Sequence, residues 1–241
     1  MCGRTTFLAS WADILAFSQP LVVLADTSND PIHSYNFAPT QVAPVLVAEH
    51  EADADARVEH MRWGLIPGWA KDAKIGAQTI NARVETVASK PAFRAAWQRR
   101  RCLVPMSGYY EWPIADGVKQ PYFIHPLESP LLFFAGLWEQ WRTSQGEAVL
   151  SFSIITRAAI GEIAQLHDRM PLALEPSVFG DWLFGDAARA QTLVDAAPPV
   201  SVAFHPVTRA VGNPRNDFAE LIEPIALEPA AATSDTVKKG G

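Results

Sequence analysis

The chain has 241 residues, a formal net charge of −6, 49% hydrophobic residues and 19% charged residues. This composition supplies a sizeable core and argues against intrinsic disorder, and the negative charge argues against broad, tight binding to duplex DNA, which needs many phosphate contacts. Any nucleic-acid site would have to be a local basic groove. The N-terminus carries no basic region followed by an apolar one, and no apolar run reaches membrane-spanning length. We therefore expect a cytoplasmic protein with reduced thiols.

The first hundred residues are predicted to mix helix and strand. Ser10, with Asp13 three residues later, is typical of a helix N-cap, and the helix would run to about Phe17 with Trp11, Ile14 and Leu15 facing inward. The next expected elements are a strand at 42–48, its partner at 58–66 across the turn 49–57, and a helix from Ser89 with Pro91 in its first turn.

The second half is predicted to be richer in strands. The expected strands are 101–112, 122–125, 131–141, 148–156 and 202–207, with Gly117 and Gly146 marking two turns. Helical stretches are expected at 158–166 and from Pro176 and Ala187. The pattern predicts an α+β fold, a single domain over residues 1–225 with a mostly antiparallel, barrel-like β core flanked by short helices. Residues 226–241, rich in small side chains, are expected to form a disordered tail.

Two cysteines lie 100 positions apart and form no metal-binding or redox motif. Cys102 has the pattern of a small buried residue on a strand. Cys2 differs, because removal of Met1 would leave it with a free α-amine and a thiol on adjacent carbons. The amine titrates near ~7.7–8.0 and the thiol near ~8.5, so both nucleophiles are usable near neutrality. Such a 1,2-aminothiol condenses with an aldehyde to a Schiff base, and the sulfur then closes a thiazolidine ring. We expect an N-terminal side chain to contribute little to core packing.

Two internal segments are unusually polar for their apolar surroundings. On a strand at 80–86, period two places Asn81, Arg83 and Glu85 on one face, which is either a solvated sheet face or part of a site. Glu111 lies among three aromatic residues in the segment 107–113. Partial burial would raise its pKa into the range useful for acid–base work, whereas a strand-end glutamate facing solvent would keep an ordinary pKa.

Two further segments carry histidines. His167, in 166–171, would lie near the C-terminus of the helix 158–166, where the macrodipole favours the protonated imidazole. It is either a proton donor or a helix cap. The loop 205–214 is either a rigid loop whose backbone N–H groups meet an anion or a tight connection.

Taken in order, seven short motifs resemble one family, the SOS response-associated peptidase (SRAP) family of abasic-site processing proteins. The motifs are Met-Cys-Gly-Arg at 1–4, Tyr-Asn-Phe-Ala-Pro at 35–39, Trp-Gly-Leu-Ile-Pro at 63–67, Asn-Ala-Arg-Val-Glu-Thr at 81–86, Tyr-Glu-Trp at 110–112, His-Asp-Arg-Met-Pro at 167–171 and His-Pro-Val at 205–207. They run from Cys2 to about Pro224. Each motif alone is weak, but the ordered set is specific.

The resemblance implies a covalent self-crosslink to abasic sites in single-stranded DNA, with autocatalytic loss of Met1 and lyase-type Schiff-base chemistry. By the same resemblance Cys2 is the nucleophile, Asn81 orients its amine, Glu111 moves protons at the amine and sugar, and His167 opens and recloses the deoxyribose. The implied DNA contacts are Arg4, Arg83 and Arg169 on phosphates, Trp69 and Thr156 as lesser contacts, and Lys90, a point charge without the bidentate grip of an arginine. No metal and no organic cofactor is implied. We expect a monomer, associated with the nucleoid on damage.

Two other classes of function stay open. An N-terminal-nucleophile cysteine peptidase or amidase would form a thioester at Cys2, with Glu111 or His167 as base, and would turn over a substrate in trans. A noncovalent single-stranded-DNA-binding module would use arginines and tryptophans as a stacking groove. The absence of a basic stripe argues against the second alternative.

Overall fold

A closed five-stranded barrel forms the centre of the computed structural model, which describes residues 2–28, 31–49, 55–115 and 117–227. Its strands are β4 (Val42–Ala48), β5 (Ala56–Trp63), β7 (Arg101–Met106), β12 (Leu132–Arg142) and β13 (Ala148–Ala158). Neighbouring strands pair antiparallel except at one seam, where β13 runs parallel to β5 and closes the barrel. Large buried side chains of these strands, such as Trp63, Phe134 and Phe152, form the core of the barrel.

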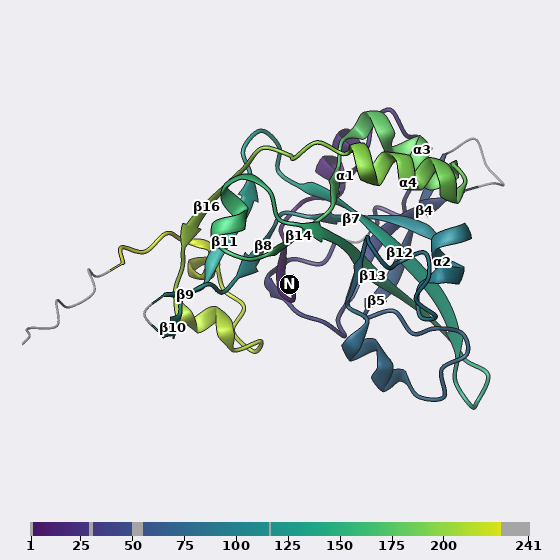
Figure 1. The fold of residues 1–241 in the computed structure, drawn as a ribbon, viewed down its shortest axis with the longest axis horizontal. Coiled ribbons are helices and arrows are strands. Elements are labelled where there is room, and N and C mark those ends of the chain that lie inside the picture. The colour runs from purple at the N-terminus through teal and green to yellow at the C-terminus, as the bar shows by residue number, and fades with distance from the viewer. Residues whose placement is uncertain (1, 29–30, 50–54, 116, 228–241) are drawn as a thin grey trace, which may run out of the picture.

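A second, wholly antiparallel sheet lies beside the barrel (Figure 1). Its order is β16 (Val202–Pro206), β11 (Tyr122–Pro126), β8 (Gly108–Glu111), β1 (Thr5–Phe7) and β3 (Ser34–Phe37). Short strands extend the barrel sheet, namely β2 (Val23–Leu24), β6 (Asn81–Arg83), β14 (Arg169–Pro171) and β15 (Ala173–Leu174), and β9 (Ile114–Ala115) pairs with β10 (Val118–Lys119) in a separate hairpin.

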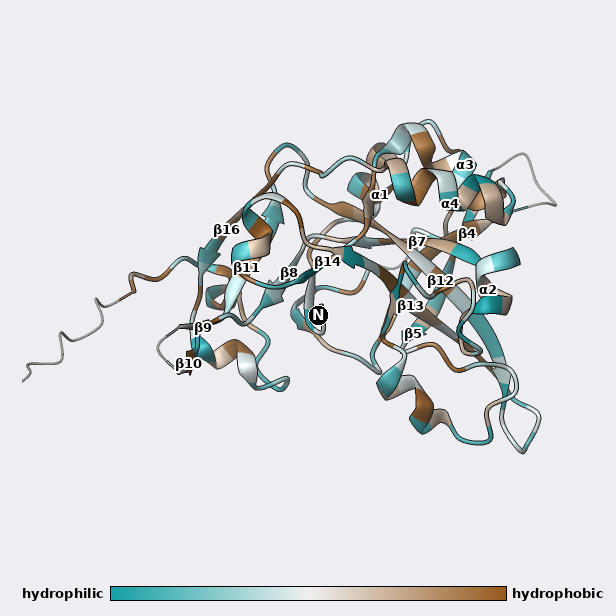
Figure 2. Cartoon of the chain, in the orientation of Figure 1, coloured by the Kyte–Doolittle hydropathy of each residue, from teal (hydrophilic) through white to brown (hydrophobic). Residues whose placement is uncertain are grey.

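The helices are short and lie on the outside, as predicted. They are α1 (Trp11–Phe17), α2 (Arg94–Arg99), α3 (Phe179–Phe184) and α4 (Ala187–Ala196), with 3-10 turns at Ala73–Gln78, Gly161–Gln165, Pro176–Val178, Arg209–Gly212 and Ala219–Ile222. Figure 2 shows hydrophobic and hydrophilic turns alternating on α3 and α4, because one side of each packs inward. No helix within the described ranges is long and apolar enough to cross a membrane. The prediction of an α+β domain with a barrel-like core is confirmed.

The expected single strand 101–112 is wrong, because Ser107 divides it into β7 and β8. At this point the chain leaves the barrel for the second sheet. Ser107 donates its N–H to Thr6 O at 3.0 Å and accepts the Leu8 N–H on its hydroxyl at 2.9 Å. A Cβ on Gly108 would lie 2.5 Å from the Phe123 ring and 2.7 Å from Ile124 O, so only glycine fits this crossing.

Three other element predictions need correction. The helix 158–166 is only the 3-10 turn Gly161–Gln165, since β13 continues to Ala158 and Gly161 has φ +61°. The helix from Ser89 begins at Arg94. The strand 80–86 is limited to β6, so Asn81 and Arg83 share a strand face but Glu85 lies in the following turn.

The remaining predictions agree closely with the structure. Ser10 and Asp13 form a reciprocal capping box on α1. The strand at 42–48 is β4. Its predicted partner at 58–66 is β5, which starts at Ala56 and ends at Trp63, because Gly64 has φ +114° and the chain turns there. Gly117 and Gly146 adopt φ +77° and +87° in their turns. The centre of the 49–57 turn and nearly all of the predicted tail lie outside the described residues.

Candidate active site

Cys2 lies buried where the two sheets meet. Its side chain is fully buried in the main core cluster, so the expectation that it contributes little to packing is wrong. The β1–β8 register pairs Thr5 with Tyr109 and Thr6 with Gly108. Extending this register two residues toward the N-terminus sets Gly3 opposite Glu111. Burial, and then the charge of Glu111, raises the pKa of the Cys2 thiol. The resting thiol is therefore protonated.

Glu111 ends β8 and is almost fully buried, with 2% of its surface exposed. Burial raises its pKa to about 7, and the positive charge at the start of the chain opposes this rise. A solvent-facing strand-end glutamate is thus ruled out. A carboxyl group that titrates near neutrality can both accept and release a proton at physiological pH.

Asn81 holds the backbone of Cys2 through its side-chain amide. Its Nδ2 donates to Cys2 O at 2.6 Å, while its Oδ1 is buried without a partner among the described residues. Strand β6 places it there, because Asn81 pairs with Ile154 of β13 in parallel. An unpaired buried acceptor beside the start of β1 is suited to accept an N–H from an α-amine at Cys2.

His167 follows the 3-10 turn rather than an α-helix, and the predicted protonated state is wrong. Burial lowers the pKa of the imidazole, and the positive charge at the chain start lowers it further. Nδ1 accepts the Arg169 N–H at 2.9 Å when it carries no proton. Asp168 Oδ1 lies 2.7 Å from the same Nδ1 and can receive its proton once the ring is charged.

Arg169 forms a fork with Glu85 beside His167. Nη1 donates to Glu85 Oε1 at 2.6 Å, and Nη2 donates to Glu85 Oε2 at 2.9 Å and to Thr156 O at 2.7 Å. The Thr156 side chain is fully buried, and its Oγ1 has no partner among the described residues. The expected DNA contacts Arg169 and Thr156 are thus positioned by one another, and a phosphate would have to compete with Glu85 for the guanidinium.

Arg4 is engaged in a second buried network, with Asn36 at its centre. Arg4 Nη1 donates to Asn36 Oδ1 at 2.6 Å and to Val211 O at 2.9 Å. Asn36 Nδ2 lies within hydrogen-bond distance of the carbonyl oxygens of Val211, Asn213 and Asn216 at 3.3, 3.0 and 2.7 Å. These contacts fasten the loop 209–216 to β3, which favours the tight connection over an anion-binding loop.

Asn36 is a residue of the site that sequence reasoning did not assign. The available signal was its position between two aromatics, Tyr35 and Phe37, because an asparagine is unfavourable at the centre of an apolar strand unless its amide is satisfied.

Replacing Asn36 with alanine is expected to lower the free energy of unfolding by about 2–4 kcal/mol, because the substitution removes all hydrogen bonds of a buried side-chain amide at once. Urea unfolding followed by tryptophan fluorescence measures this. The matched control is Asn213→Ala, since Asn213 is exposed and its side chain accepts only one local bond, from the Arg215 N–H. Equal effects of the two substitutions would contradict the central role of Asn36.

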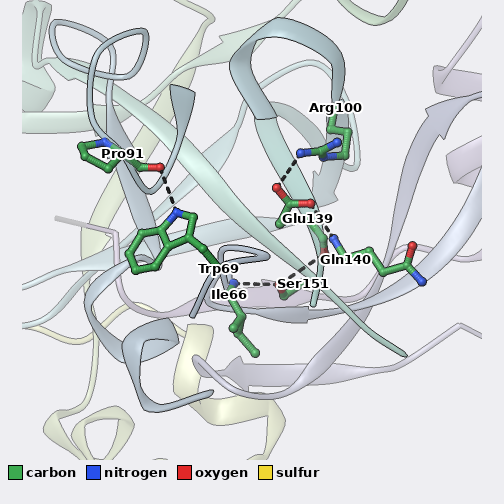
Figure 3. Close-up of polar contacts among 7 residues, drawn as sticks. All are labelled: Ile66, Trp69, Pro91, Arg100, Glu139, Gln140 and Ser151. Atoms are coloured by element: carbon green, nitrogen blue, oxygen red, sulfur yellow. Dashed lines mark hydrogen bonds and ion pairs between the residues drawn. The ribbon is translucent and has the colours of Figure 1, made fainter. Parts of the chain in front are cut away.

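The remaining predicted DNA contacts are exposed. The side chains of Arg83 and Lys90 have no ion pair among the described residues, and Trp69 is 62% exposed. Figure 3 shows how the Trp69 loop is held: Trp69 Nε1 points at Pro91 O at 3.4 Å, and the Ile66 N–H is bound by the Ser151 hydroxyl at 2.8 Å. Trp141 Nε1 also donates to Ala70 O at 2.7 Å. The exposed indole is therefore presented by a fixed loop.

As a whole, the site holds a buried cysteine near the start of the chain, a carboxyl group whose charge acts on it, an amide bonded to its backbone and an imidazole that feels the charge of the chain start. The described residues contain no cluster of histidine, cysteine or carboxylate side chains that could hold a metal ion. Cys102 is a free, fully buried cysteine on β7, in agreement with the structural role predicted for it. The site therefore groups Cys2 with side chains that can accept or donate protons.

Comparison with known proteins gives the family. The sequence profile of the SOS response associated peptidase (SRAP) family matches residues 1–214, and the chain belongs to this family. The abasic site processing protein YoqW of Bacillus subtilis is 36% identical over 227 residues, covering 92% of this chain and 99% of the relative. The abasic site processing protein YedK of Escherichia coli is 32% identical over 230 residues, covering 93% and 100%.

A solved structure shares the fold. A protein from Bacteroides thetaiotaomicron superposes with a TM-score of 0.77 at 24% identity, covering 93% of this chain and all of that one. At this identity the likeness concerns the fold alone, and it supports the α+β assignment.

Proposed function

We propose that this protein processes abasic sites in single-stranded DNA by linking itself to them through Cys2, within a catalytic unit of residues 1–225. The observation that carries the proposal is the burial of Cys2 beside a carboxyl group of raised pKa and an amide with an unpaired acceptor. The family membership and the names of the relatives support it. Loss of Met1, by the protein's own action, would free the amine.

The chemistry balances without a cofactor. The ring-opened aldehyde of the abasic sugar takes up the Cys2 amine, and the resulting carbinolamine loses water to give an imine. The thiol then adds across the C=N bond: the C–S bond forms, the π electron pair moves to nitrogen, and the thiol proton follows. One water is lost overall. The thiazolidine resists hydrolysis better than the imine and would shield the lesion from strand cleavage.

Two residues divide the proton transfers. Glu111, titrating near neutrality, takes a proton from the Cys2 ammonium and later returns one to the ring nitrogen. His167 opens and recloses the hemiacetal of the sugar. Its Nδ1 accepts the Arg169 N–H when the ring is neutral, and it can share a proton with Asp168 when the ring is charged. Each such group can contribute ~10²–10⁴-fold to rate.

The test is an incubation of the Met1-processed protein with a single-stranded oligonucleotide that contains one abasic site, followed by denaturing electrophoresis. We expect a band shifted by the mass of the oligonucleotide. The matched control carries a tetrahydrofuran residue, which lacks the aldehyde, and should give no band. A complex that dissociates in denaturant would favour the noncovalent module, and cleavage of fluorogenic amides in trans would favour the peptidase.

His167→Ala is expected to slow adduct formation and adduct reversal by the same factor, on the order of 10²-fold or more. A proton carrier lowers the barrier from both sides, so the adduct fraction at equilibrium should change little. Single-turnover time courses in both directions measure this. Unchanged rates in a variant that unfolds several kcal/mol more easily would make His167 a structural cap.

Arg83→Ala is expected to weaken capture of abasic single strands, because its exposed guanidinium is available to a phosphate. Each phosphate contact contributes about −0.7 to the slope of log K against log salt for single strands, so the variant should lose roughly that amount from an already shallow slope. The control is Arg189→Ala, which removes an exposed arginine of α4 that pairs with Asp181. Equal competition by intact duplex, or a slope that indicates ten or so phosphates, would contradict a local single-strand site.

A further inference from the structure

Tyr109, on β8, carries a hydroxyl that the site described above does not use. Tyr109 precedes Glu111 by two residues, so the two side chains share one face of the strand. Tyr109 belongs to the core cluster that contains Cys2 and is 2% exposed. Tyr110 points the other way, into a separate cluster, and its hydroxyl donates to Tyr35 O at 2.6 Å.

This hydroxyl is buried and has no hydrogen-bond partner among the described residues. Burial, followed by the charges of Cys2 and Glu111, raises the pKa of the phenol. The phenol therefore stays protonated, and its O–H is a donor on the face of β8 that also carries Glu111. Packing does not require the hydroxyl, because the edge contact of the ring with Phe134, at 5.9 Å between centroids, would be the same for phenylalanine. A buried donor without a protein partner needs an explanation, and a role toward the neighbouring reactive groups is one.

We propose that Tyr109 is a catalytic residue whose hydroxyl donates a hydrogen bond to the Cys2 sulfur during closure and opening of the thiazolidine ring. This inference rests on the proposed crosslinking at Cys2. In the forward step the C–S bond forms, the π pair of the imine moves to nitrogen, and the thiol proton moves to nitrogen through Glu111. In the reverse step the C–S bond breaks and the sulfur keeps the electron pair. The Tyr109 O–H stabilises the negative charge on sulfur in both directions, as oxyanion-hole donors do for oxygen.

The proposal separates ring closure from imine formation, which does not involve the sulfur. In Tyr109→Phe, imine formation should proceed at the wild-type rate and ring closure should slow by about 10- to 100-fold. Quenching the reaction at intervals with borohydride traps the imine as a stable amine two hydrogens heavier, whereas the thiazolidine is not reduced. Mass spectrometry of the products then gives the two fractions. We expect an early reducible adduct in the variant that wild-type protein passes through without accumulation.

The neighbouring variant Tyr110→Phe and the melting temperatures of both variants make the result decisive. Tyr110→Phe removes a hydroxyl that has a partner, and should lower stability without any accumulation of imine. Tyr109→Phe should melt at or above the wild-type temperature, because it loses only an unpaired buried group. Two results would overturn the assignment. One is a Tyr109→Phe variant that divides its adduct between reducible and non-reducible forms as wild type does. The other is a melting temperature of Tyr109→Phe that is lowered as far as that of Tyr110→Phe. Absence of any adduct with wild-type protein would instead reject the proposed function itself.

Discussion

Cys2→Ala is expected to abolish the adduct that survives denaturation. Alanine at the same position still offers an α-amine after Met1 removal, so an imine can form, but no sulfur is present to close the ring. The yield on a denaturing gel should fall to background. Because Cys2 is fully buried, the substitution should also cost roughly 1 kcal/mol of stability.

Two controls isolate the sulfur and the amine. Cys2→Ser keeps the size of the side chain, so it should fold like wild type and still fail to give the stable adduct. A protein whose Met1 is blocked by an N-terminal tag keeps the thiol but acylates the amine, and it should be equally inactive. A denaturation-resistant adduct at wild-type yield from Cys2→Ala, or from the tagged protein with its tag still attached, would contradict the thiazolidine mechanism.

Glu111→Gln is expected to have the second largest effect, with opposite signs on activity and on stability. Below the amine pKa of ~7.7–8.0 most of the Cys2 amine is protonated and needs a base. Glu111 must itself be ionised to act as that base, so its removal should slow adduct formation most between pH values of about 7 and 8, by ~10²-fold or more. DNA binding should persist, since Glu111 is not one of the residues proposed to bind the DNA phosphates. Single-turnover rates between pH 6 and 9 measure the loss, and a loss that does not depend on pH would contradict the base role.

The stability effect follows from the same pKa. The folded pKa of about 7 lies above the ordinary glutamate pKa of 4.5, so folding takes up a proton between these values. Wild-type stability should therefore fall as pH rises from about 4.5 through 7, by roughly 3 kcal/mol in total. Glutamine carries no charge, so Glu111→Gln should be more stable than wild type at pH 8 and similar to it near pH 4.5. Urea unfolding at both pH values tests this, and equal destabilisation at both would mean that the contribution of Glu111 to stability does not depend on its charge, so that folding does not raise its pKa.

The barrel strands could be predicted from sequence because each is a local pattern. The β-branched run 42–48 and the long apolar stretches around Phe134 and Phe152 predict strands directly. The parallel seam between β13 and β5 could not be predicted, because it joins Ser151 to Arg62 and no local pattern specifies a pairing at that separation. The short strands β1 and β3 were missed since three or four residues carry too little periodicity.

The site divides in the same way. The unusual environment of Glu111 was readable from the aromatics beside it in sequence. The protonation of His167 was predicted wrongly, because the macrodipole argument assumed an α-helix where Gly161 allows only a 3-10 turn. The pairing of Arg169 with Glu85 depends on residues 84 positions apart. Only the fold decides that this arginine is held by a carboxylate while Arg83 stays exposed.

The most direct test of the central claim is the chemical state of the N-terminal peptide after reaction. Crosslinked protein is digested with nuclease and trypsin, and the peptide Cys2–Arg4 is analysed by mass spectrometry. The account predicts that this peptide, without Met1, carries the abasic sugar remnant with the loss of one water, and that the product is inert to borohydride and to thiol alkylation. A remnant on any other residue, or a Cys2 sulfur that alkylates while the sugar remains attached, would contradict the account.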